Sequence, residues 1–160
     1  MDTLITKYFY QVCGALLVTL SVSICFFLVL KISPPNESML KEINGPIDKI
    51  EYTDNQFIIS IGSLSLTYEK WNGDITNVTK FLSKKINDNV DLLVYFDQSD
   101  SGKIYSVHVG KVPVRTLKSV LEHRRNLIAS IVMISILCIL LGLAGISFGG
   151  RIAEMNKSIM

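Results

Sequence analysis

The run LIASIVMISILCILLGLAGISF at residues 127–148 contains no Asp, Glu, Lys or Arg. The hydrocarbon core of a bilayer is about 30 Å thick, and about 20 apolar helical residues cross it with every backbone polar group satisfied. The run has that length, and Arg124, Arg125 and Arg151 bracket it. We therefore predict a transmembrane helix at residues 127–149, followed by a C-terminal tail at 150–160.

A second uncharged run, VCGALLVTLSVSICFFLVL, occupies residues 12–30. It is longer than the apolar region of a cleaved signal peptide, and no small-x-small cleavage site follows it. A buried core helix is the alternative for both runs. The rest of this 160-residue chain is too short to cover two long helices that are apolar on every side. We predict an uncleaved transmembrane helix at 12–32, preceded by a tail at 1–11.

Nearly all charged residues, which make up 19% of the chain, lie between the two runs. Four basic residues gather just before the second run, and we interpret them as a membrane-surface anchor near lipid headgroups: Arg115, Lys118, Arg124 and Arg125. Positive residues near a span favour the cytoplasmic side. The pattern favours a cytoplasmic central domain, and we expect a multi-pass protein of the cell membrane, the inner membrane of a bacterium.

The central segment shows short β-like runs separated by turn residues. After a linker at 33–44, the order is three strands, one helix and two strands. The predicted strands are 46–52, 56–61, 64–68, 90–96 and 103–109, with a helix between the third and fourth that ends at 87–89. We assign 45–113 to this domain and 114–126 to a helical connector that continues into the second span.

The order β-β-β-α-β-β is that of an OB-like five-stranded barrel with a helix at one end. An open five-stranded sheet with the helix on one face is the alternative. The fold class predicted is therefore a membrane protein of α+β type, with two transmembrane helices flanking a small five-stranded barrel or sheet.

Three runs carry a resemblance to a family: GPIDKIEY at 45–52, VDLLVYF at 90–96 and GKIYSVHV at 102–109. With the helix that enters a span, they resemble uncharacterised bacterial two-span membrane proteins with an OB-like soluble domain. A more distant resemblance is to the soluble domain of NfeD-type proteins. The resemblance rests on layout and implies no catalytic residue.

The sequence predicts no enzyme, cofactor or metal site. All three cysteines lie in the apolar runs, so the soluble part has no disulfide framework and no thiolate ligand. His108 and His123 lack a second ligand at metal-binding spacing. Residues 33–126 carry twelve basic and twelve acidic side chains, whereas nucleic-acid binding normally needs a basic surface. No small-molecule substrate is indicated.

Small residues recur in both spans at spacings that allow close helix packing, within the chain or in a homo-oligomer. The predicted packing residues are Ala15, Thr19 and Ser23 in the first span, and Cys138, Gly142, Gly145 and Gly149 in the second. We predict a membrane-anchored protein-interaction or scaffolding module, whose partners are the lipid bilayer and another protein. The alternatives are an immunity or exclusion protein of a mobile element, and an accessory subunit of a membrane transporter or enzyme.

Overall fold

The structure is a computed structural model that describes residues 2–53, 55–85, 91–98 and 102–159. The chain divides into a helical unit, Met1–Ile32 with Leu127–Met160, and a β-domain, Ser33–Asn126. The predicted helix end at 87–89 lies outside the described residues.

The helical unit consists of α1 (Asp2–Ile32) and most of α3 (Leu117–Ile159). Two stretches, Lys7–Ile32 and Leu117–Gly149, are long and apolar enough to cross a membrane, by length and composition. A core helix of a soluble protein also meets those two criteria, but it is mostly buried. Here only 11% of each apolar window is buried. The prediction of two long apolar helices is therefore confirmed.

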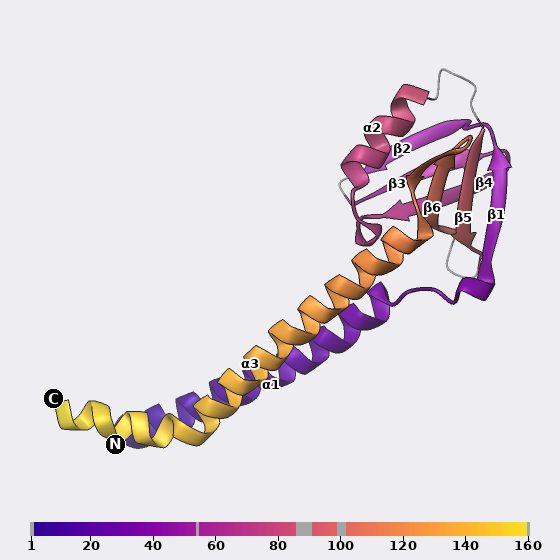
Figure 1. The fold of residues 1–160 in the computed structure, drawn as a ribbon. Coiled ribbons are helices and arrows are strands. Elements are labelled where there is room, and N and C mark those ends of the chain that lie inside the picture. Colours follow the sequence, from indigo (N-terminus) through magenta and orange to yellow (C-terminus); the bar gives the residue numbers. More distant parts are fainter. Residues whose placement is uncertain (1, 54, 86–90, 99–101, 160) are drawn as a thin grey trace. The chain divides into compact units, whose positions relative to one another are not determined.

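Residues with reduced exposure recur on α1 and α3 in alternating steps of three and four. On α1 they include Gly14, Val18, Ser21 and Cys25; on α3 they include Ile131, Ser135, Cys138, Gly142, Gly145 and Gly149. This spacing is that of two nearly antiparallel or parallel helices packed along a narrow seam. The contacts pair the start of α1 with the end of α3, so the helices are antiparallel (Figure 1).

In the part that the structure describes, the β-domain contains seven strands, the helix α2 and two short 3-10 helices. In chain order its elements are η1 (Glu37–Met39), β1 (Leu40–Gly45), β2 (Lys49–Thr53), β3 (Gln56–Ile61), β4 (Leu64–Glu69), η2 (Lys70–Asn72), α2 (Ile75–Lys85), β5 (Leu92–Asp97), β6 (Lys103–Val109), β7 (Val112–Arg115) and the beginning of α3.

The strands form one mixed sheet in the order β1-β5-β6-β4-β3-β2, with β7 paired to β6. All pairs are antiparallel except β4 with β6, which meet in parallel at Thr67 and Lys103. Because β5 occupies one side of β6 along its whole length, β4 and β7 must share the other side. The strand order ends at β1 and β2, so the sheet of the described residues is open.

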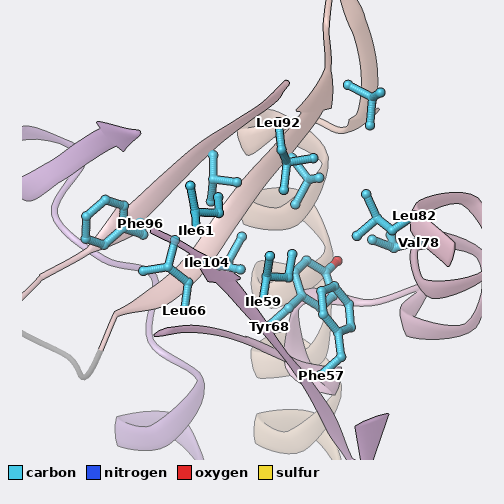
Figure 2. Packing of buried hydrophobic residues seen from close by; sticks show 13 residues of the cluster. Phe57, Ile59, Ile61, Leu66, Tyr68, Val78, Leu82, Leu92, Phe96 and Ile104 are labelled. Carbon is cyan, nitrogen blue, oxygen red and sulfur yellow. The ribbon is translucent and has the colours of Figure 1, made fainter. Parts of the chain in front are cut away.

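The core includes residues of the sheet and of α2. Alternate residues of β3, such as Phe57, Ile59 and Ile61, are buried, as the period of two in a half-buried strand requires. Figure 2 shows Val78 and Leu82 of α2 pointing into the same cluster. These two residues are four apart and therefore lie on one face of the helix.

The predicted OB-like barrel is wrong, and so is the count of five strands. Over the described ranges of the chain the sheet is open and seven-stranded. β1 falls in the predicted linker, because its sequence LKEING has no strand-like alternation and only pairing with β5 makes it a strand. β7 contains Pro113, which lacks a backbone N–H and suits a strand at an edge or with one partner.

Candidate functional site

A buried polar cluster lies in the β-domain where the first turns of α3 meet the sheet. Its centre is Arg124, whose side chain is among the largest fully buried ones in the described chain at 1% exposure. Glu69 ends β4 and Asn72 ends η2, so the strand and the short helix after it bring both to the same place. Tyr105 comes from β6.

The guanidinium of Arg124 has a partner in several directions. Its Nε donates a hydrogen bond to Asn72 Oδ1 at 2.6 Å, and Nη1 donates to the backbone oxygen of Ser33 at 3.1 Å. Nη2 lies 3.7 Å from Glu69 Oε2, and the guanidinium carbon lies 4.8 Å from the centre of the Tyr105 ring. A buried charge is tolerated only when it is paired and hydrogen-bonded in this way.

Asn72 links this charge to the sheet and to the turn after it. Its side-chain amide donates to the backbone oxygen of Ile104 in β6. Its own backbone oxygen accepts from Arg115 Nη2 at 3.0 Å and from the hydroxyl of Tyr68 at 3.2 Å. One asparagine therefore connects β6, the end of β7 and α3.

The Tyr68 hydroxyl also donates to the backbone oxygen of Gly73 at 2.7 Å. Burial raises the pKa of Tyr68 to about 12. Gly73 has φ of +75°, and a Cβ at this position would lie 2.8 Å from Arg115 Nη2 and 2.9 Å from His123 Cδ2. The turn therefore needs glycine for both its backbone conformation and its closeness to the cluster.

The side chains of the cluster contact one another and the backbone. Arg124 and Asn72 direct their polar atoms at each other and at backbone carbonyls, and Glu69 is also within 3.5 Å of Lys103. These contacts attach the first turns of α3 to the sheet. Sequence reasoning missed Asn72, Glu69 and Tyr105, since their spacing carries no local signal.

The four residues predicted as a membrane-surface anchor differ in their exposure. Arg124 is buried and Arg115 is half-buried in the cluster, so the prediction that they face lipid headgroups is corrected. In its buried position the Arg124 guanidinium lies beside the Glu69 carboxylate and the Tyr105 ring. Lys118 and Arg125 are exposed, as an anchor requires.

Lys118 and Arg125 line a surface pocket of about 280 Å³. The other lining residues are Glu37 from η1 and Leu117, Leu121 and Glu122 from α3. The pocket is thus made of two cations, two carboxylates and two leucines. No sequence pattern predicted it, because Glu37 lies 80 residues before Leu117.

The helix contact in the helical unit is built around glycine. A Cβ on Gly142 would lie 2.7 Å from the backbone oxygen of Gly14 and 2.7 Å from Val18 Cγ2. A Cβ on Gly149 would lie 2.6 Å from Tyr10 Cβ, whereas for Gly145 the nearest described atom, Tyr10 O, would lie at 3.5 Å. Cys138 is half-buried on the same side of α3.

The residues predicted for packing on α1 lie elsewhere. Ala15, Thr19 and Ser23 are exposed, and the Thr19 hydroxyl bonds to the backbone oxygens of Ala15 and Leu16. The contact between α1 and α3 is made by Gly14 and Val18 of α1. When two helices cross at a small angle, the buried residues are spaced by alternating steps of three and four and not by steps of four alone. Gly14, the only glycine of the first apolar run, was the available signal.

No group of three or more His, Cys, Asp or Glu that could hold a metal ion occurs among the described residues. His108 lies on β6 beside the Tyr95 ring, with 6.2 Å between ring centres. His123 lies on α3 beside Gly73.

No family model, no curated protein and no solved structure matches this chain. The resemblance to two-span proteins with an OB-like domain stays a prediction.

Proposed function

We propose that this chain is a membrane-anchored interaction module, in which α1 and α3 cross a bilayer and the β-domain binds a protein partner beside it. The observation that carries the proposal is the outward display of apolar side chains on both helices. Phe27 is 69% exposed and Leu141 is 66% exposed, in runs that contain no charge. Lipid is the solvent in which such surfaces have the lowest free energy.

A role in binding is supported by the outer edges of the sheet. In the described chain β1 pairs only with β5, and β2 pairs only with β3. The free edge of a strand presents backbone N–H and C=O groups that can pair with an added strand. A side chain of α2 contacts β2, since the Tyr52 hydroxyl lies 2.6 Å from Ser83 Oγ. The free edge of β1 is therefore the proposed partner-binding edge.

A binding role rather than catalysis is supported by the polar cluster around Arg124. Among the described residues, Arg124 donates hydrogen bonds to Asn72 Oδ1 and to the Ser33 carbonyl, and Arg115 donates to the Asn72 carbonyl, so these contacts hold parts of the fold together. We propose a cytoplasmic β-domain in a bacterial inner membrane, with the exposed Lys118 and Arg125 on the cytoplasmic side of the second span.

Membrane anchoring is tested by alkaline carbonate extraction of membranes from cells that express the intact chain. The chain should stay in the pellet. Recovery in the supernatant, or in the soluble fraction of the cells, would refute anchoring.

The side of the β-domain is tested with Lys111→Cys, an exposed position in a domain that has no cysteine of its own. A membrane-impermeant maleimide should label this variant only after the cells are permeabilised. The unaltered chain, with its cysteines in the apolar helices, is the control.

Partner binding is tested with a photo-crosslinking amino acid at Asn44 on β1 or at Lys84 on α2, both exposed. We expect one discrete adduct from position 44 and none from position 84. Turnover of a substrate by the purified chain, or tight oligonucleotide binding at physiological salt, would contradict the proposal.

A further inference from the structure

The pocket formed by Glu37, Leu117, Lys118, Leu121, Glu122 and Arg125 is not part of the buried polar cluster. Its α3 residues lie on one face of the helix, in steps of three and four, and Glu37 of η1 also lines it. At about 280 Å³ it is near the small end of ligand-binding pockets, which start at about 300 Å³.

The four charged side chains of this pocket are unpaired within the described chain. Glu37, Lys118, Glu122 and Arg125 are all exposed, and none forms an ion pair with a described residue. Arg124, the neighbour of Arg125 in sequence, is in contrast buried and hydrogen-bonded. The pocket therefore offers charges of both signs that the fold itself does not use.

In the sequence, Arg125 stands just before the second apolar run. Arg125 precedes Leu127 by two residues, which is about 3 Å along a helix axis. If α3 spans the bilayer, as the proposed function states, the phosphate layer of the lipids is the chemistry nearest to Arg125. The inference that follows rests on that function.

The pocket has two formal positive and two formal negative charges, so its complement is a zwitterion rather than an anion. A purely anionic headgroup would meet Glu37 and Glu122 as like charges. Carboxylates favour a primary ammonium, because it donates hydrogen bonds. A trimethylammonium has no N–H and is typically held by aromatic rings, and no aromatic residue lines this pocket.

We propose that this pocket binds the headgroup of an ethanolamine phospholipid. Arg125 and Lys118 contact the phosphate, while Glu37 and Glu122 accept hydrogen bonds from the ammonium group. Leu117 and Leu121 provide an apolar wall for the methylene groups of the headgroup.

The test is native mass spectrometry of the full chain in mild detergent, titrated separately with phosphatidylethanolamine, phosphatidylcholine and phosphatidylglycerol of the same acyl chains. We expect the ethanolamine lipid to bind about fivefold more strongly than the other two, the ratio that one exposed ion pair of about 1 kcal/mol produces. Equal binding of the three lipids, or a preference for phosphatidylglycerol, would overturn the proposal.

Variants separate the two halves of the headgroup. Glu37→Gln combined with Glu122→Gln should abolish the preference for ethanolamine over choline, and Arg125→Gln should weaken binding of both lipids. Glu51→Gln on β2, exposed and distant in sequence from α3, is the matched control and should change neither. An unchanged preference in the double carboxylate variant would also overturn the proposal.

Carbonate extraction of the same variants keeps this inference distinct from the proposed function. A chain that stays in the membrane but shows no ethanolamine preference contradicts only the lipid site. A chain that is extracted contradicts membrane anchoring and, with it, the premise of the site.

Discussion

Replacing Arg124 with methionine tests whether the buried polar cluster holds α3 to the sheet. The change keeps an unbranched apolar stem and removes the guanidinium, so the hydrogen bonds from Arg124 to Asn72 Oδ1 and to the Ser33 carbonyl are lost. Removing one partner of a buried ionic contact costs about 3–5 kcal/mol. The lower figure applies here, because Glu69 keeps Lys103 at 3.5 Å and is not left as an uncompensated charge.

A loss of about 3 kcal/mol lowers the Tm of a domain of this size by at least about 12 °C. The assay is thermal unfolding of the intact chain in detergent, followed by the fluorescence of Trp71. This residue is the only tryptophan and the neighbour of Asn72, so its signal reports on the β-domain.

Arg125→Met is the matched control, with the same substitution one residue later at an exposed position. It should change stability by no more than about 0.5 kcal/mol, or about 4 °C in Tm. If Arg124→Met falls within the same range as Arg125→Met, the reasoning about the cluster is refuted.

Three further predictions concern single contacts. Gly142→Ala should destabilise the helical unit by about 1–3 kcal/mol, because the added Cβ would lie 2.7 Å from Gly14 O. Gly145→Ala, whose nearest described neighbour lies at 3.5 Å, should be tolerated. Hydrogen exchange of α1 in nanodiscs measures the difference, and equal protection in the two variants would contradict the prediction. Gly73→Ala should destabilise the β-domain more than Gly110→Ala. Both glycines have positive φ, but of the two only Gly73 has described atoms within 4 Å of an added Cβ. Thermal unfolding compares the two variants, and the reverse order of stability would be evidence against crowding at the cluster. The pKa of Tyr68 is raised from 10.0 to about 12 by burial, so its contribution to stability is complete below pH 10 and is lost as the pH rises from 10 towards 12. Alkaline unfolding monitored by Trp71 fluorescence should show this loss in the unaltered chain and a smaller one in Tyr68→Phe, and identical alkaline profiles would exclude the buried hydroxyl as the cause.

The two long helices and α2 follow from local properties of the sequence. An uncharged run of more than 18 residues and an apolar period of 3.6 specify a helix without reference to distant residues. The strands β3, β4, β5 and β6 were predicted close to their observed positions for the same reason. Alternation of apolar and polar residues with period two is a local property of each strand. Their pairing was not predicted, because it joins residues far apart in the chain.

The candidate site was only partly accessible to sequence reasoning. The basic residues before the second span stood out by composition, yet composition could not separate Arg124 from Arg125. One is buried against Asn72 and the other lines an exposed pocket with Glu37. Successive positions on a helix point about 100° apart, so the fold alone decides which of two neighbours faces inward.

By itself, the sequence determined that two long apolar helices flank a polar β-rich segment with one amphipathic helix, because length, charge and periodicity act within each element. Only the tertiary structure decided that the sheet is open, that β1 and β7 are strands, that Gly14 meets Gly142, and that Arg124 is buried. Each of these features depends on backbone or side-chain contacts between residues distant in sequence. Such contacts stabilise the protein only once the folded chain has brought the residues together.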